Sequence, residues 1–242
     1  MNSGIFSTLF YKPLYNTLIL SLSVVPGANV GVAIVFLTLL VRTILLPLSH
    51  KSVVSQAKMR AIAPDLEGIK EKFKDDKQEQ AKKTMELYKQ HGINPFSGCI
   101  VIFVQLPVLF ALYFVFSKGL HTLSADTLYS FVHLPSFIGM NFLWVNLTEK
   151  SIIFAVIAAV TQYFQIKLSM PPSAPAPEGA PRSFKDDFAR SFNVQMRFML
   201  PLIVFGVSYS ISAAVALYWA TSNLFSIGHE FYVKKKALTV IN

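Results

Sequence analysis

Long apolar blocks alternate along the chain with stretches rich in charged residues. Four blocks carry no charged residue apart from Arg42: 29–48, 99–116, 151–166 and 198–227. The first three are 16 to 20 residues long, close to the roughly 20 that one helical membrane crossing needs. Only 14% of all residues are charged, against about 25% in ordinary soluble domains. The pattern therefore predicts a membrane protein built from spanning helices.

The last block, 198–227, is too long for one crossing. As a single helix its 30 residues would reach about 45 Å, whereas the hydrocarbon core is about 30 Å thick. Basic residues flank it on both sides, which favours the cytoplasm for both flanks and requires an even number of crossings. Two short helices joined near 208–212 meet this requirement, and their shortness predicts local thinning of the bilayer. The total becomes five spans.

The first apolar stretch has a different pattern. Phe10, Leu14, Leu18, Leu22 and Val25 recur every three or four positions, which is typical of an amphipathic helix lying in the membrane interface. The competing interpretation is an uncleaved, signal-like segment that spans poorly.

Lys and Arg residues set the orientation. Residues 51–91 contain ten of them, whereas residues 118–150 contain two. Because cytoplasmic loops carry the excess of Lys and Arg, the first stretch is expected inside and the second outside. The formal net charge of +9 is explained by these flanks and by anionic lipid, so we expect no direct nucleic-acid function. The N-terminus is predicted outside and the C-terminus in the cytoplasm.

We therefore predict an all-α, polytopic membrane protein with five transmembrane helices. Its predicted segments are an extracytoplasmic amphipathic helix at 1–27, span one at 28–50, a cytoplasmic helical hairpin at 51–93, span two at 94–118, an extracytoplasmic loop at 119–148, span three at 149–168, a cytoplasmic Pro-rich loop at 169–195, span four at 196–210, span five at 211–232 and a cytoplasmic tail at 233–242. Pro64 makes an unbroken first helix of the hairpin unfavourable. The stretch 170–181 contains five prolines and is expected to be an unstructured linker.

Arg42 is the most informative single residue. It lies six positions before the cytoplasmic end of its block, and a lone arginine in a span costs about 2.5–3.5 kcal/mol on insertion scales. Snorkelling to the headgroups is the simple explanation. However, Thr38 lies one turn away on the same face, and none of the 13 acidic residues falls in an apolar block. Water or an acidic group of another molecule must then satisfy Arg42, which predicts a hydrophilic cavity open to the cytoplasm.

Polar residues in the other spans are candidates for the lining of this cavity: Gln105, Gln162, Gln165, Ser222 and Asn223. Each alone is more often a hydrogen-bonding residue between helices. Together with an unpaired arginine they favour a hydrophilic pocket within the bundle.

The sequence gives little support for a catalytic or metal-binding site. The sequence has no Walker loop, no HExxH and no pair of intramembrane carboxylates, and its five histidines lack ligand spacing. Cys99 is the single cysteine, which excludes an intrachain disulfide and a thiol metal cluster. We expect no enzymatic activity, no cofactor and no metal.

Several short strings occur in the order of a known family. They are Leu37–Arg42 with Leu46–Leu48, Ala57–Arg60, Asp75–Gln78, Leu87–Lys89, Asn94-Pro95 with Gly98-Cys99, Gln105–Pro107, and Leu217–Trp219 with Ser222–Leu224. On these residues the chain resembles the YidC/Oxa family of membrane insertases from about Phe6 to Tyr232, and it is most similar to the compact five-span bacterial members.

The resemblance implies a mechanism. Arg42 would lie in a groove open to the cytoplasm and lipid, where it attracts the acidic or polar tail of a client protein. Tyr218 and Trp219 would face the same groove. The hairpin would receive clients and ribosomes through Lys58, Arg60, Asp75, Asp76 and Lys77. Implied partners are nascent membrane proteins, the lipid bilayer, the Sec translocon, the signal recognition particle pathway and the ribosome, at a bacterial plasma membrane.

Three positions depart from the family pattern. Many members have a tyrosine pair where this chain has Tyr218-Trp219, and a Pro-Ser-Gly-like turn where it has Ser210–Ala213. Only six residues follow Lys236, so ribosome docking through a long basic tail is not expected.

Two rival hypotheses use the same residues. A small-solute or ion transporter would need paired midplane charges, inverted repeats or discontinuous helices, and only Pro107 and Pro201 hint at broken spans. A purely structural subunit would leave Arg42 without a role.

Overall fold

The computed structural model describes residues 4–94, 97–116, 125–169 and 184–241. The chain is all-α apart from one two-stranded antiparallel pair in the described part. The elements are η1 (Ser7–Tyr11), α1 (Lys12–Val24), η2 (Pro26–Ala28), α2 (Val30–Ile44), α3 (Leu46–Ala61), α4 (Ala63–Lys72), α5 (Lys77–Gln90), α6 (Ser97–Phe114), η4 (Ala125–Thr127), β1 (Asn141–Phe142), β2 (Val145–Asn146), α8 (Ile152–Ser169), α9 (Phe184–Ile211) and α10 (Ala213–Ile241).

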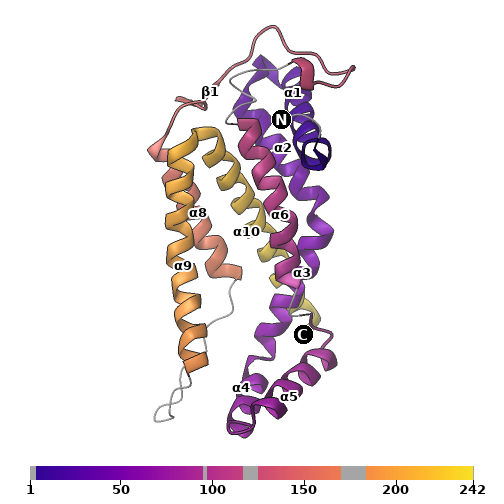
Figure 1. Ribbon diagram of the computed structural model, residues 1–242, viewed down its shortest axis with the longest axis vertical. Helices are drawn as coiled ribbons and strands as arrows, with labels where there is room; N and C mark the ends of the chain where they lie inside the picture. The colour runs from indigo at the N-terminus through magenta and orange to yellow at the C-terminus, as the bar shows by residue number, and fades with distance from the viewer. Residues whose placement is uncertain (1–3, 95–96, 117–124, 170–183, 242) are drawn as a thin grey trace.

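The long helices run roughly along one axis of the molecule (Figure 1). The helices α4 and α5 lie at one end, whereas β1 and α1 lie at the other. The last helix, α10, packs against α8 and α2, and α9 packs against α8. The central position of α10 lets its residues meet side chains from several helices.

A 65° bend separates α2 from α3. Pro47 lies in the first turn of α3, and because proline has no N–H and crowds the carbonyl four residues earlier, it disrupts a straight continuation. The predicted span 28–50 therefore contains this bend, with α2 before it and the first five residues of α3 after it.

Length and hydropathy alone identify few complete spans in the described residues. The helix α8 meets both criteria, and the bent pair α2 and α3 meets them when counted as one span. Residues Phe103–Phe114 and Gln195–Ile211 form shorter apolar helices. The count of five crossings stays a prediction.

The long apolar block 198–227 is occupied by α9 and α10, with a break at Ser212. Both helices are longer than expected. Residues 184–195 were predicted to lie in the loop and 233–241 in the tail, yet both are helical. Neither stretch contains Pro or Gly, so nothing in them interrupts a helix. The Pro-rich linker 170–181 lies outside the described residues, while Pro107 and Pro201 both lie inside continuous helices.

The helices α4 and α5 pack against each other as a pair. Asp76 caps α5, because its carboxylate accepts hydrogen bonds from the N–H groups of Gln78 and Glu79 at 3.1 and 3.0 Å. Gln80 donates to the Lys70 carbonyl at 3.1 Å. The chain turns from α3 into α4 at Ile62, just before Pro64. The cytoplasmic location of this pair stays a prediction.

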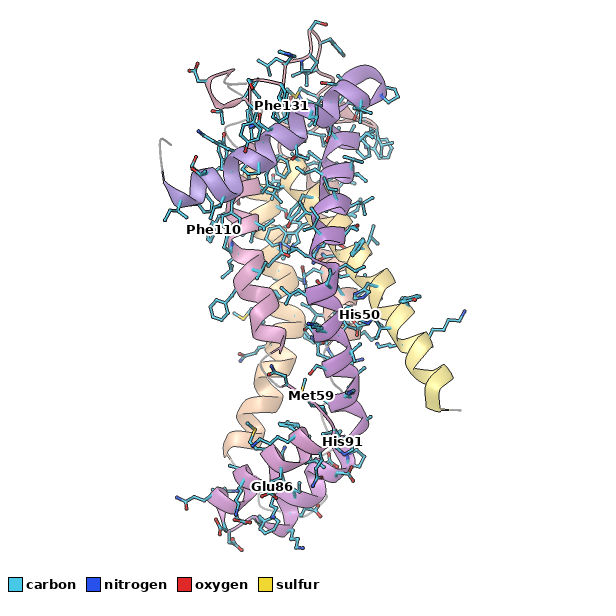
Figure 2. The ribbon with its side chains drawn as sticks, turned by 90° about the vertical axis from the view of Figure 1, so that its right-hand side faces the viewer. His50, Met59, Glu86, His91, Phe110 and Phe131 are labelled. Atoms are coloured by element: carbon cyan, nitrogen blue, oxygen red, sulfur yellow. The ribbon has the colours of Figure 1, made fainter. Side chains whose placement is uncertain are left out.

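The N-terminal helix lies across the end of the bundle, at a steep angle to the long helices (Figure 2). Leu18 and Leu22 are buried, and Phe10 and Leu14 are partly buried against the core, so the predicted apolar face packs on the protein itself. The opposite face is also apolar, since Ile5, Leu9 and Val24 are exposed. The helix is therefore less amphipathic than the pattern suggested.

Large apolar side chains cover the outside of the long helices. They include Phe36 and Leu39 of α2, Phe103 and Phe110 of α6, Ile152 and Val156 of α8, and Phe198 and Leu202 of α9, all exposed. We call this surface the apolar belt. Such an extent of exposed apolar area is characteristic of contact with lipid or protein rather than water.

Candidate functional site

Arg42 makes its contact with a hydroxyl group. It lies in the last turn of α2, is half-buried, and donates from Nε to Ser222 Oγ at 2.7 Å. Its Nη2 donates to the same oxygen. Ser222 belongs to α10 and is 1% exposed. No carboxylate in the described part of the chain forms a salt bridge with Arg42, so its charge is not neutralised there.

Tyr218 extends this contact to a third helix. It lies one turn before Ser222 on α10 and is buried, and its hydroxyl accepts a hydrogen bond from Gln105 Nε2 of α6 at 2.9 Å. Residues four apart lie on one face of a helix. Arg42, Gln105, Tyr218 and Ser222 therefore form one cluster where α2, α6 and α10 meet, which we call the arginine cluster.

An apolar pocket adjoins this cluster at Tyr218. Its volume is about 330 Å³, and it lies between α6, α9 and α10. Trp219 is half-buried and lines the pocket. The other lining residues are Leu109, Phe110, Leu112, Tyr113, Phe114, Phe116, Val207, Ile211, Val215 and Tyr218. The pocket places an apolar surface against Tyr218, one turn of α10 from the Ser222 hydroxyl that Arg42 contacts.

The remaining hydrogen-bonding capacity of Arg42 decides what the arrangement can do. A guanidinium has five N–H donors and is always protonated. Ser222 accepts from Nε and Nη2 through one oxygen. Within the described part of the chain no other acceptor contacts Arg42, so its remaining donors can meet water or an incoming acceptor, and a carboxylate is the acceptor that matches their planar geometry best.

The other predicted groove residues lie elsewhere. Thr38 is 2% exposed and donates to the Ile34 carbonyl of its own helix at 2.6 Å, so its hydroxyl is part of the packed interior. Asn223 donates from Nδ2 to the Ala158 carbonyl at 3.4 Å and to Thr161 Oγ1 at 3.3 Å. Asn223 therefore connects α10 to α8, on a different side of α10 from the side that Arg42 contacts through Ser222.

Gln162 and Gln165 belong to a second polar cluster. Gln162 Nε2 donates to Gln165 Oε1 at 3.1 Å, and Gln165 Nε2 donates to Ser169 Oγ at 3.0 Å. Ser169 Oγ then donates to Glu230 Oε2 at 2.6 Å. This chain of hydrogen bonds leads along α8 to a carboxylate on α10.

Glu230 is the buried anion of the second cluster. It is 3% exposed, and its Oε1 lies 3.2 Å from Arg60 Nη2 and 3.4 Å from Lys234 Nζ. Arg60 and Lys234 also donate to the Leu168 carbonyl at the end of α8. Sequence reasoning missed Glu230; the available signal was its i,i+4 spacing to Lys234, a common helical ion pair.

A histidine pair lies between the two clusters along the chain. His50 Nδ1 of α3 and His229 Nε2 of α10 are 3.2 Å apart, and Figure 2 labels His50 at this level of the bundle. The contacts Arg42–Ser222, His50–His229 and Arg60–Glu230 therefore join α2 and α3 to α10 in succession.

The hairpin residues that were predicted to face clients lie in different surroundings. Lys58 Nζ donates to the His91 carbonyl at 3.2 Å, and Arg60 points into the second cluster. Asp75 and Lys77 are exposed, and Asp76 caps α5. Further along α5, Lys83 lies 2.8 Å from Glu86 and holds the pKa of that carboxyl below its usual value.

Comparison with known proteins finds relatives that all carry the same description. The family model described as "60Kd inner membrane protein" matches residues 21–239. A membrane protein insertase YidC of Clostridium tetani is 35% identical over 211 residues, covering 87% of this chain and 84% of that protein. The YidC of Fusobacterium nucleatum is 33% identical, covering 86% of this chain and 87% of that protein. The YidC of Wolinella succinogenes is 33% identical over 95% of this chain, which corresponds to 38% of that longer protein.

The family match covers most of the chain, including every residue of the arginine cluster and of the second cluster. The chain therefore belongs to the YidC/Oxa family of membrane protein insertases.

Proposed function

We propose that this chain inserts client membrane proteins into the bacterial inner membrane through the arginine cluster. The observation that carries the proposal is Arg42, a half-buried cation on an apolar helix whose contact in the described residues is the hydroxyl of Ser222. A structural arginine in a membrane span is ordinarily paired with an acidic side chain or with backbone carbonyls, and the described residues offer Arg42 neither. A client carboxylate supplies the missing partner.

The geometry supports a transient interaction rather than tight binding. A client carboxylate would form charge-assisted hydrogen bonds with the remaining N–H groups of Arg42. Removing it from water costs several kcal/mol per ion even in relaxed proteins, roughly offsetting the attraction. The acidic tail of a client is therefore held long enough to leave the cytoplasm but not trapped.

The adjoining pocket supports a route for the apolar part of the client. Its walls on α6, α9 and α10 are apolar, and α6 and α9 also carry exposed side chains of the apolar belt. An apolar client segment would exchange this surface for lipid at little cost, because both are hydrocarbon. Trp219 and Tyr218 would line the point of entry.

The finer topology is part of the proposal. Five crossings follow from the four apolar blocks, the last of which must cross twice, and the outside N-terminus and cytoplasmic α4 and α5 pair follow from the distribution of Lys and Arg. This pair, the turn that joins its helices and the end of α3 would receive clients through Lys58, Asp75, Asp76 and Lys77, with the Sec translocon, the signal recognition particle pathway and the ribosome as partners. We propose a chaperone-like, non-enzymatic mechanism without a cofactor.

The rival transporter hypothesis is not supported, because the curated relatives carry the name membrane protein insertase. The prolines on which broken spans depended also lie within continuous helices.

The test uses purified protein in liposomes and a small single-span client with an acidic N-terminal tail, scored by protease protection. Protein-dependent protection supports the proposal. Arg42→Ala should lower the initial rate about tenfold or more, since a hydrogen bond to a charged group contributes roughly 1.5–3 kcal/mol. Arg42→Lys should restore part of the rate if charge matters more than guanidinium geometry.

Two controls make the result specific. Lys150→Ala removes an exposed cation of the same charge outside the groove and should leave the rate unchanged. A client with a neutral tail should respond weakly to Arg42→Ala. Full activity of Arg42→Ala on the acidic client, at equal protein level, would exclude the electrostatic mechanism.

A further inference from the structure

Two large apolar side chains project from the tip of the β1–β2 hairpin. Phe142 pairs with Val145, so Leu143 and Trp144 form a two-residue turn, and they are 67% and 74% exposed. Leu143 has φ +55°, a backbone conformation that such turns usually assign to Gly, Asn or Asp. The chain thus presents an exposed leucine and an exposed tryptophan on a turn whose first position, with its positive φ, is unfavourable for leucine.

The hairpin is firmly held although its tip is exposed. Val30 N–H donates to the Gly139 carbonyl at 2.9 Å, and Asn29 Nδ2 donates to the Asn141 carbonyl at 2.7 Å. On the other side, the N–H groups of Ala213 and Ala214 donate to the carbonyls of Glu149 and Leu147 at 2.7 and 3.0 Å. The hairpin is therefore attached to the first residues of both α2 and α10.

The tip lies at the edge of the apolar belt. Phe142 contacts Phe154 of α8 with ring centroids 6.4 Å apart, and Figure 1 shows β1 beside the ends of the long helices opposite α4 and α5. The belt begins at the same level, with exposed Val32 on α2 and exposed Ile152 and Ile153 on α8. The apolar tip is continuous with the start of the apolar belt, which faces lipid. The tip therefore lies at the depth where the lipid headgroup region would be. Tryptophan is enriched in that region, because its ring is apolar and its N–H is polar.

We propose that Leu143 and Trp144 anchor the β1–β2 hairpin in the interfacial layer of the outer leaflet. The partner is the lipid itself, and the proposal rests on the membrane placement given under Proposed function. Because the hairpin is bonded to the starts of α2 and α10, the anchor sets the depth of both helices. Arg42 and Ser222 lie on these two helices. Arg42 follows the start of α2 by 12 residues, about 18 Å along the helix, so the anchor determines how far the arginine cluster lies below the outer surface.

The chain offers a direct optical test, because Trp144 and Trp219 are its two tryptophans. The full chain carrying Trp219→Phe, reconstituted alone into phosphatidylcholine and phosphatidylglycerol vesicles, has Trp144 as its sole tryptophan. Its emission should lie at shorter wavelength than that of tryptophan in water. Lipids brominated near the headgroup should quench it more strongly than lipids brominated near the chain ends, and aqueous iodide should quench it weakly.

Two further variants keep the test decisive. If Trp219→Phe does not fold, the native spectrum minus that of Trp144→Phe reports the same residue. Leu143→Gly relieves the strain of the positive φ and retains Trp144. Because one of the two apolar side chains of the tip is lost, quenching of Trp144 by bromine near the headgroup should be reduced but still present. Water-like emission with strong iodide quenching would overturn the proposal, as would stronger quenching by chain-end bromine. A shift that required added Sec translocon would overturn it in favour of a protein partner. The vesicles contain no client protein, so this measurement does not depend on insertion activity. A failure of the insertion assay can therefore be distinguished from a failure of the anchor proposal.

Discussion

At the scale of single residues, Gly31 shows how closely α2 approaches the β1–β2 hairpin. A Cβ atom at this position would overlap the ring and Cβ of Phe142, and Gly31 is buried. Gly31→Ala should therefore destabilise the protein by about 1–3 kcal/mol through overpacking. The free energy of unfolding, measured by denaturant titration in detergent, checks this expectation.

Gly206→Ala is the matched control for Gly31→Ala. Gly206 lies inside α9, and nothing is within 4 Å of its hypothetical Cβ. The substitution should stabilise by about 0.5–1 kcal/mol, because alanine is the better helix former. Equal effects at the two positions would show that crowding by Phe142 is not the cause.

Ser222 is the residue on which the Arg42 geometry depends. Ser222→Ala removes the oxygen that accepts from Nε and Nη2, and a lost hydrogen bond to a charged group costs about 1.5–3 kcal/mol. Ser226→Ala is the control, since Ser226 donates to a carbonyl of its own helix at 3.0 Å. We expect Ser222→Ala, but not Ser226→Ala, to lower the stability. In a double-mutant cycle, Ser222→Ala should have no such effect in an Arg42→Met background.

At the scale of elements, the second cluster connects α3, α8 and α10. Glu230→Gln leaves Arg60 and Lys234 without their anion, and removing one partner of a buried ion pair costs about 3–5 kcal/mol. The side chains of Arg60 and Lys234 are 18% and 33% exposed, so about 2–3 kcal/mol is the better expectation. Hydrogen exchange of α3 should increase, because its end loses a contact to α10.

Glu86→Gln provides a comparison on the exposed pair with Lys83. Lys83 holds the pKa of Glu86 below its usual value. The depressed pKa stabilises the folded protein above the unfolded pKa, and this contribution is lost as the pH falls through the folded pKa. At neutral pH the pair is charged, but solvent screens it. No measurable change in stability is expected, and a loss as large as that of Glu230→Gln would contradict the importance of burial.

At the scale of the whole molecule, the proposed orientation can be read from cysteine accessibility. In a Cys99→Ser background, Ser130→Cys lies in the 119–148 loop and Gly68→Cys lies in α4, and both native residues are exposed. A membrane-impermeant maleimide should label Ser130→Cys in intact cells. It should label Gly68→Cys only after the membrane is opened. Labelling of both sites in intact cells would refute the predicted topology.

Several features at this scale followed from the pattern of residues. The length of block 198–227 required two helices, and α9 and α10 meet at Ser212 within it. Arg42 stood out because its cost in lipid demands a partner. Pro64 lies at the start of α4, where a break in the first helix of the hairpin was expected, whereas the bend at Pro47 within the predicted span 28–50 was not expected.

Other features needed the tertiary structure because they join distant parts of the chain. Gln105, Gln162 and Gln165 looked equivalent in the sequence, yet Gln105 reaches Tyr218 whereas the other two lead to Glu230. The difference arises because α6 and α8 contact different sides of α10. Glu230 itself pairs with Arg60, 170 residues earlier, and no local periodicity reports such a pairing.

The sequence by itself predicted which blocks of the chain meet lipid, and it determined where a lone charge in an apolar block must find a partner. Both follow from transfer free energies, which depend on residue type and local order. Only the tertiary structure decided that, among the residues it describes, this partner is the Ser222 hydroxyl, and that Leu143 and Trp144 are exposed. These facts depend on how the helices pack around α10, because packing brings together side chains that the sequence separates.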